Sequence, residues 1–494
     1  MESRLAARNG GRAGLAALVA ILLLGLGLRV GYAWDGRSPV YDAQAYGAIA
    51  ASLDRGNGFT VGAAATQPSS AYSPGLPLLV AGLYRLTGGV DERLARVVLA
   101  LVASLAVPFT YLLGRRLWGS LGLRAGPGDR PSGAGRPGDP GAVVAGLLGA
   151  AAVAVYPAFL EYGGMLMGEP LAATLLSGAM LAMLWARDGE SSRRWLLPGA
   201  LLGGLSLVRP EYLAVSVLLA VIAGLTARRS SRPPLPGDEE QPRGRVAAAG
   251  GWRPRVARGA VVLAGVAAVV LPWTARNAVA LDRLVPISTG GGQVLFAGTY
   301  LPSDGNPERV GAEVVAEHPE LFGPGALRRL RLEQILARLA AREHPGVEAD
   351  RALSQMGREQ LWDDLTEEPL EYAGFLATKV GRIWSHGPRD VMREPAWEAL
   401  HWTLLGLGLL GLCVLAWRRR WEALLLGTVF LSITAISALL VASPRRVLVM
   451  LPLVAALAGL GAVWLATRAW RAGARAPEHP PAGGSGGRRL RARG

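Results

Sequence analysis

The sequence predicts an all-α protein that crosses a membrane many times, and two observations support this. Of its 494 residues, 51% are apolar, and the mean hydropathy is positive at +0.29. A soluble chain of this length would be expected to form two or three globular domains. Here the apolar residues are instead gathered into windows of about 20 residues with almost no charge, the length of helix that crosses a hydrocarbon core of about 30 Å.

Ten such windows follow one another along the chain, and we expect a bundle of about 10–13 transmembrane helices. Their approximate ranges are 13–33, 94–114, 141–158, 169–186, 195–208, 211–227, 257–274, 397–417, 421–441 and 447–467. The first window follows an arginine-rich start and ends near Gly31-Tyr32-Ala33, a weak match to a signal-peptide cleavage site. Its long apolar core and the many later spans favour an uncleaved first helix over that alternative.

The arginines orient these spans. If the N-terminus lies inside and the spans alternate, the inside segments hold most of the short-loop arginines. They are Arg115, Arg116, Arg193, Arg194, Arg228, Arg229, Arg418, Arg419, Arg420 and those of the C-terminal tail. This is the positive-inside pattern of a cytoplasmic membrane protein, with both termini in the cytoplasm. The proline- and glycine-rich inside loops around 127–140 and 232–255 are predicted to be flexible linkers.

Two long segments are then predicted to lie outside. We divide the chain into an N-terminal transmembrane catalytic module, 1–275, which includes the first outward loop 34–93, an outward-facing loop or small domain, 276–395, C-terminal transmembrane helices, 396–467, and a disordered basic cytoplasmic tail, 468–494. Segment 74–86 is apolar but short and contains proline, so we interpret it as interfacial or re-entrant. If it crossed the membrane, every later orientation would be reversed.

The composition excludes several classes of function. The formal net charge is +15, but the basic residues are nearly all arginine, and Lys379 is the only lysine. No basic patch is interleaved with aromatic residues, so no nucleic-acid partner is predicted. The single cysteine, Cys413, lies in an apolar window and excludes intramolecular disulfides and thiolate metal clusters. The five histidines lack metal-ligand spacing, and no phosphate-binding loop or dinucleotide fingerprint occurs.

Two acids stand at the predicted outer face. Asp42 begins a short amphipathic segment, Tyr41–Ala50, in which Tyr46 lies one helical turn later. Glu169 begins the fourth span, one residue before Pro170. A charge at this depth is costly unless it caps a helix, pairs, or lines a wet cavity. Both acids are therefore candidates for chemistry, and capping of a helix N-terminus is the alternative for each.

Several arginines are also predicted at the outer ends of spans. Arg209 lies between two apolar spans in Arg209-Pro210-Glu211, and Arg276 follows Pro272-Trp273; Arg445 and Arg446 precede the last span. A guanidinium fork suits a phosphate group. Each arginine is a candidate phosphate ligand, with anchoring to lipid headgroups as the alternative.

Taken together, these segments resemble the GT-C superfamily of membrane glycosyltransferases, and within it the branch of protein O-mannosyltransferases and the lipid A aminoarabinose transferase. The resembling residues are Asp42 with Tyr46 and Ile49-Ala50, Gly56-x-Gly58-Phe59, Ser73-Pro74-Gly75-Leu76-Pro77-Leu78-Leu79, Tyr156-Pro157, Gly168-Glu169-Pro170, Arg209-Pro210, Pro272-Trp273-x-x-Arg276-Asn277, Ser288-Thr289-Gly290-Gly291, Glu368-Pro369-Leu370-Glu371-Tyr372 and Lys379. Each motif is weak alone, and their order from about residue 13 to 467 carries the resemblance.

The resemblance implies a GT-C-like bundle with interfacial helices in the first outward loop. It implies an inverting transferase that moves a sugar from a polyprenyl-phosphate donor to a protein, lipid or glycan hydroxyl outside the cytoplasmic membrane. Asp42 matches the position of the general base, and Glu169 that of a second acid that helps to position substrate. We assign the donor phosphate to Arg209 and Arg276. Some relatives use a divalent cation, but no tightly bound metal is predicted here.

Two other functions remain open from the sequence. A secondary transporter would place charges in mid-membrane and show paired repeats with broken helices, whereas the span 141–158 carries no charge. A membrane scaffold without catalytic activity is the second alternative, in which Asp42 is only a helix cap.

Overall fold

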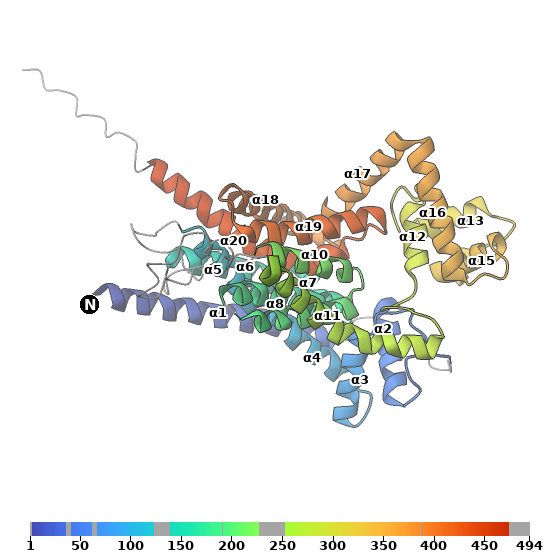
Figure 1. The fold of residues 1–494 in the computed structure, drawn as a ribbon, viewed down its shortest axis with the longest axis horizontal. Coiled ribbons are helices and arrows are strands. Elements are labelled where there is room, and N and C mark those ends of the chain that lie inside the picture. Colours follow the sequence, from blue (N-terminus) through green and yellow to red (C-terminus); the bar gives the residue numbers. More distant parts are fainter. Residues whose placement is uncertain are drawn as a thin grey trace, which may run out of the picture.

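The computed structural model describes residues 2–35, 41–61, 67–122, 139–189, 191–226, 252–385 and 387–473. Within these ranges every regular element is a helix (Figure 1). The predicted linkers at 127–140 and 232–255 lie almost wholly outside the described residues, as does the tail from residue 474. The tail prediction began at 468, but the last helix continues to Gly473.

Seven helical segments are long and apolar enough to cross a membrane. They are α1 (Glu2–Asp35), α4 (Glu92–Ser104) continued by α5 (Ala106–Ser120), α8 (Gly168–Asp188), α11 (Trp252–Leu281), α18 (Pro395–Trp417), α19 (Trp421–Leu439) and α20 (Arg445–Gly473). An eighth span is formed if α6 (Pro140–Val155) and α7 (Pro157–Gly163), which are bent by 59° at Tyr156, are counted together. These segments confirm the prediction of an all-α, multi-pass membrane protein.

The expected 10–13 spans exceed the seven or eight that qualify by length and composition. The difference lies in α9 (Leu196–Val208) and α10 (Tyr212–Leu225), which have 13 and 14 residues, whereas a span needs about 20. The 3-10 turn η1 (Ser192–Trp195) precedes α9 and lengthens it. Arg209, at the end of α9, pairs with Glu169 at the start of the 21-residue α8. Together η1 and α9 therefore return along the whole of α8.

The break in the α6–α7 span is held by a buried arginine that the sequence analysis did not single out. Pro157 has no N–H group, so the Val153 carbonyl, four residues earlier, lacks a helical donor. Arg29 of α1, fully buried, donates from Nη2 to this carbonyl at 2.8 Å and from Nη1 to the Gly25 carbonyl at 2.9 Å. Its guanidinium also lies 5.1 Å from the centroid of the Phe159 ring. Arg29 thus satisfies the backbone where the span bends.

Glycines bring three of the spans into backbone contact. A Cβ atom at Gly411 of α18 would overlap the Leu457 carbonyl of α20, and one at Gly459 of α20 would overlap the Ala145 carbonyl of α6. Small residues at helix interfaces allow this close approach in membranes, where association depends on packing. In line with this, 83% of the apolar window of α20 is buried. α20 is therefore the central span of the bundle.

The segment predicted as the first outward loop, 34–93, contributes two short helices, α2 (Tyr41–Asp54) and α3 (Gly75–Thr87). The helix predicted at 41–50 is confirmed. α3 has 13 residues, too few for an ordinary span, and its start packs so closely on α9 that a Cβ at Gly75 would overlap Val208. In Figure 1, α3 runs across the direction of α1 and not along it. These features agree with an interfacial helix, which remains a prediction.

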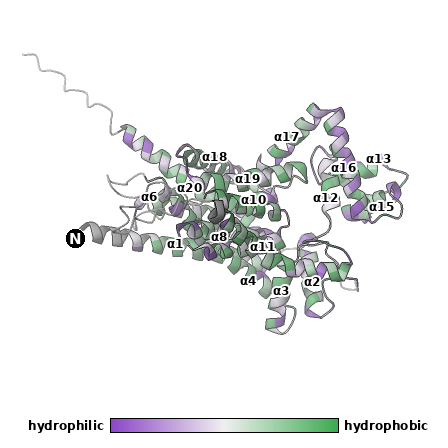
Figure 2. Ribbon diagram, viewed as in Figure 1, coloured by the Kyte–Doolittle hydropathy of each residue, from purple (hydrophilic) through white to green (hydrophobic). Residues whose placement is uncertain are grey.

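The segment between α11 and α18 forms helices beyond one end of the bundle (Figure 1). They are α12 (Gly291–Thr299), α13 (Val310–Glu317), α14 (Ala326–Arg329), α15 (Leu332–Glu343), α16 (Ala349–Glu367) and α17 (Pro369–Ser385). Figure 2 shows purple, hydrophilic residues frequent in these helices and green, apolar ones dominant in the bundle. Helices α12 to α16 share a second apolar core, which includes Phe296, Tyr300, Val310, Val314, Leu336, Leu339 and Leu353.

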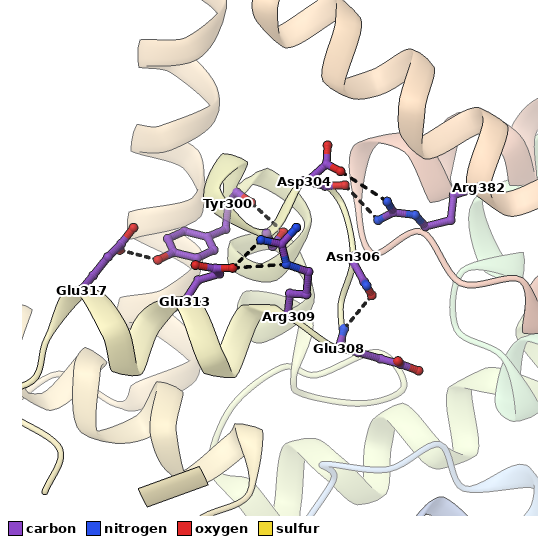
Figure 3. Close-up of polar contacts among 9 residues, drawn as sticks. Tyr300, Asp304, Asn306, Glu308, Arg309, Glu313, Glu317 and Arg382 are labelled. Carbon is purple, nitrogen blue, oxygen red and sulfur yellow. Dashed lines mark hydrogen bonds and ion pairs between the residues drawn. The ribbon is translucent and has the colours of Figure 1, made fainter. Parts of the chain in front are cut away.

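Polar contacts fix the turn after α12 (Figure 3). Tyr300 donates to Glu317, and Arg309 pairs with Glu313 at 2.6 Å. Arg382 of α17 reaches across to Asp304, donating to its backbone carbonyl at 2.8 Å. These contacts join α12, α13 and α17 into one unit.

The only lysine lies at the same junction. Lys379 is fully buried on α17, donates to the Gly298 carbonyl and lies 4.9 Å from the centroid of the Phe375 ring. Gly305 packs on its aliphatic chain, where the positive φ of 65° and the lack of room for a Cβ both require glycine. Burial, and then the nearby charge of Arg446, lowers the pKa of Lys379 to about 7.

The glycine contacts predict that the effect of a glycine-to-alanine substitution on stability depends on whether the glycine lies at a helix contact. Gly411→Ala should destabilise the protein by about 1–3 kcal/mol, because α18 and α20 must separate to admit the methyl group. Gly406→Ala, on the same helix with nothing within 4 Å of the new Cβ, should be neutral or stabilising. Thermal unfolding of the detergent-solubilised variants tests this, and equal midpoints for the two would contradict the packing.

Lys379 predicts a pH dependence. Its pKa is about 7 in the folded protein and about 10.4 in an unfolded chain. Between these values the unfolded state binds more protons, so this group makes stability rise with pH. Lys379→Met should remove that rise, measured as the shift in unfolding midpoint between pH 7.5 and pH 9.5. Arg382→Met, one turn away on α17, should keep the rise; a Lys379→Met profile identical to the wild type would refute the argument.

Candidate functional site

Four carboxylates meet four arginines at the end of the bundle from which the outer helices extend. Each pair joins two different parts of the chain, and the pairs are Asp42–Arg445, Glu169–Arg209, Glu161–Arg389 and Glu211–Arg446. Unpaired ions at the edge of a low-dielectric bundle are costly, so carboxylates in such places are expected to have cationic partners. We call this set of eight residues the charged cluster.

Asp42 is the most accessible acid of the charged cluster. It lies in the first turn of α2, and its Oδ2 accepts a hydrogen bond from Arg445 Nη1 at 2.6 Å. α2 packs on the turn before α8, where a Cβ at Gly47 would lie 3.4 Å from Leu166. The Asp42 side chain remains 42% exposed. The carboxylate is therefore engaged by another helix and open to solvent, which a simple helix cap does not require.

Glu169 is placed differently. It lies in the first turn of α8, is fully buried, and pairs with Arg209 at the end of α9. A carboxylate without exposed surface cannot contact a substrate in this arrangement. The Arg209 side chain is 23% exposed. The accessible member of this ion pair is therefore the cation, and the anion is buried.

Asp42, Glu169 and Arg209 come together around Tyr46. Burial raises the pKa of this phenol, and the charges of Arg209, Glu169 and Asp42 all act on it. Tyr72 packs edge-on against Tyr46, with ring centroids 5.7 Å apart. The structure thus brings three of the four predicted site residues to one place.

Arg276, the fourth, has other contacts. Its guanidinium donates to the backbone carbonyls of Ser69 at 2.9 Å and Phe59 at 3.4 Å, and to Asn277. It also lies 4.9 Å from the centroid of the Trp273 ring. These contacts tie the end of α11 to the first outward loop. Phosphate binding by Arg276 remains a prediction, but its described hydrogen bonds serve the loop.

Sequence reasoning did not find Glu161 and Arg389 as a pair. Glu161 is buried on α7, and Arg389 follows α17, more than 200 residues later. The start of α15, among the helices between α11 and α18, also lies near the site. Burial raises the pKa of Tyr72 to about 12, and the charges of Glu333 and Arg331 act on this phenol as well. Residues so distant in sequence carry no spacing signal, and only the folded chain shows them together.

A divalent cation would need several oxygen or imidazole ligands close together. Among the residues that the structure describes, no group of three or more His, Cys, Asp or Glu side chains is close enough to hold one. In the charged cluster each carboxylate faces an arginine instead of another carboxylate. The described donor set does not fit a tightly bound metal ion.

No protein-family model matches the chain, and no curated protein matches it in sequence. Among solved structures, archaeal oligosaccharyltransferase AglB from Archaeoglobus fulgidus, in complex with an inhibitory peptide and a dolichol-phosphate, is similar with a TM-score of 0.47 and 16% identity, over 94% of this chain and 52% of that one. The apo form of the Archaeoglobus fulgidus oligosaccharyltransferase gives 0.48 and 13%, over 93% and 51%. The chain spans about half the length of these structures.

The buried pair predicts a marked effect of removing one partner. Arg209→Met should cost about 3–5 kcal/mol of stability, because it leaves the Glu169 carboxylate buried without a counter-charge. The double variant Glu169→Gln with Arg209→Met should recover most of that loss. Arg309→Met, which breaks the exposed pair with Glu313, is the control and should cost at most about 1 kcal/mol. Chemical unfolding in detergent measures all three, and a double variant as unstable as Arg209→Met would disprove the pairing.

Proposed function

We propose that this protein transfers a sugar from a polyprenyl-phosphate donor to an acceptor hydroxyl at the outer face of the cytoplasmic membrane. The observation that carries the proposal is an accessible carboxylate, Asp42, held among arginines at the end of a membrane-spanning bundle. The arginine distribution assigns that end to the outside. The motif resemblance supports a glycosyl transfer of the GT-C kind.

Asp42 is the proposed general base. In the reaction its carboxylate takes the proton of the acceptor hydroxyl as that oxygen attacks the anomeric carbon. The bond between this carbon and the phosphate oxygen breaks on the opposite face, so the configuration of the anomeric carbon is inverted. A positioned base of this kind contributes about 10²–10⁴-fold to a rate. The 42% exposure of the side chain leaves room for an acceptor to approach.

Arg209 is the proposed partner of the leaving lipid phosphate. The phosphate departs as an anion and needs a cation, not a proton, because it is already a good leaving group. The partly exposed Arg209 side chain suits that role, and its ion pair with the buried Glu169 fixes its position. We therefore assign Glu169 a positioning role instead of direct catalysis. Arg276 contributes by holding the first outward loop, which carries Asp42.

A secondary transporter is the second candidate, and the 59° break between α6 and α7 favours it, because transporters use discontinuous helices at their substrate sites. The break here lies next to Glu161 and is stabilised by Arg29. A transporter would move its substrate without forming a glycosidic bond. Transfer of labelled sugar to an acceptor therefore separates the two functions.

Asp42→Asn tests the proposed function. The variant should fold normally but lose transfer of radiolabelled sugar from a polyprenyl-phosphate donor by about 10²-fold or more, since an amide cannot accept the proton. The assay uses cell-envelope membranes that contain the full-length protein, with unfolding midpoints as the check on folding. Asp54→Asn, at the far end of the same helix, is the matched control and should retain activity. Undiminished transfer by Asp42→Asn would remove Asp42 as the base.

A further inference from the structure

We infer that Arg445 is a latch that holds Asp42 in the resting site, and that the phosphate of the lipid-linked donor opens it by taking Arg445 for itself. This inference rests on the proposed function. It adds that the base becomes free only when the donor is in place.

The geometry of the pair supports a latch. Arg445 is the first residue of α20, the central and most buried span, whereas Asp42 lies on α2 at the edge of the bundle. The bond of 2.6 Å between Arg445 Nη1 and Asp42 Oδ2 connects two side chains that are 38% and 42% exposed. The central helix α20 therefore holds, through Arg445, an accessible carboxylate on the peripheral helix α2.

The other pairs of the charged cluster are less suited to opening. The side chains of Glu169, Glu161 and Glu211 are 0%, 8% and 14% exposed. Removing the arginine from any of them would leave a buried carboxylate without a counter-charge, which is strongly unfavourable. Asp42 alone would be hydrated after release. Its pair is the one that an incoming anion can break at least cost.

The chemistry of the two anions supports competition. A guanidinium binds phosphate or carboxylate with paired hydrogen bonds, and the phosphate carries more oxygen acceptors. While Arg445 Nη1 donates to Asp42 Oδ2, that oxygen is engaged and is not free to take the proton of an acceptor hydroxyl. Glu169, the partner of Arg209, and Tyr162 also lie within electrostatic reach of Arg445, so the released guanidinium keeps an anionic neighbour that it shares with Arg209. Both cations then face the same phosphate.

The latch has a thermodynamic consequence that differs from catalysis. Because Asp42 and the donor phosphate compete for Arg445, removing the charge of Asp42 should strengthen phosphate binding. An Asp42 that only repelled the phosphate through space would give a gain that survives the loss of Arg445, whereas the latch makes the gain depend on Arg445. A variant that abolishes transfer is thus expected to bind the lipid phosphate more tightly.

The test measures binding of polyprenyl phosphate without a sugar to the full-length protein in nanodiscs of zwitterionic lipid. Asp42→Asn should bind about tenfold more tightly than the wild type, and Arg445→Gln about tenfold more weakly. The double variant should bind like Arg445→Gln, because the gain requires the arginine. Arg393→Gln, which removes an exposed cation from the turn before α18, is the charge control and should bind like the wild type.

The outcomes separate the latch from the proposed function. If Asp42→Asn binds with unchanged or lower affinity, or if the double variant keeps the gain, the latch is wrong although the transferase remains. If the wild type does not bind polyprenyl phosphate at all, the proposed function fails together with the latch. An equal gain for phosphatidylglycerol would overturn gating by the donor, since any headgroup phosphate would then open the pair.

Discussion

The end of this bundle that carries the charged cluster depends on one constraint, the pairing of opposite charges at the edge of a set of apolar helices. Each acid of the charged cluster is neutralised by an arginine from a different part of the chain. The pairs therefore act as cross-links between α2, α7, α8, α9 and α20. Glycine contacts set the distances between spans, and Arg29 fixes the bend that leads to Glu161. The site is built from the same interactions that close the bundle.

The main features of the fold were predictable because a membrane imposes them. A window of apolar residues long enough to cross hydrocarbon has few alternatives to a helix, so most predicted spans coincide with described helices. Tertiary contacts matter most where a helix is shorter than an ordinary span. α9 coincides with the predicted span 195–208 but has only 13 residues, and it returns along α8 together with η1. The bend at Tyr156 needs a donor from α1, and no local pattern names Arg29 as that donor.

The candidate site was predictable only in part. Asp42, Glu169 and Arg209 could be singled out because a charge beside an apolar window is unusual wherever it occurs. Which arginine pairs with which acid is less visible. Arg445 was singled out only as a candidate phosphate ligand and not as the partner of Asp42. Arg389, the partner of Glu161, is one among many arginines in a chain with a single lysine. For Arg276, the placement beside a span predicted a phosphate ligand, and this remains a prediction. Its described hydrogen bonds go mainly to loop carbonyls.

The solitary lysine also makes the chain a natural single-site target for amine chemistry. Apart from the α-amino group, Lys379 is the only primary amine in 494 residues, and it is sealed between α12 and α17. A reagent such as an activated ester reaches it only when those helices part, so the rate of acylation counts the opening events of the outer helices. The wild-type protein can therefore report the local opening of α12 and α17 without an introduced label.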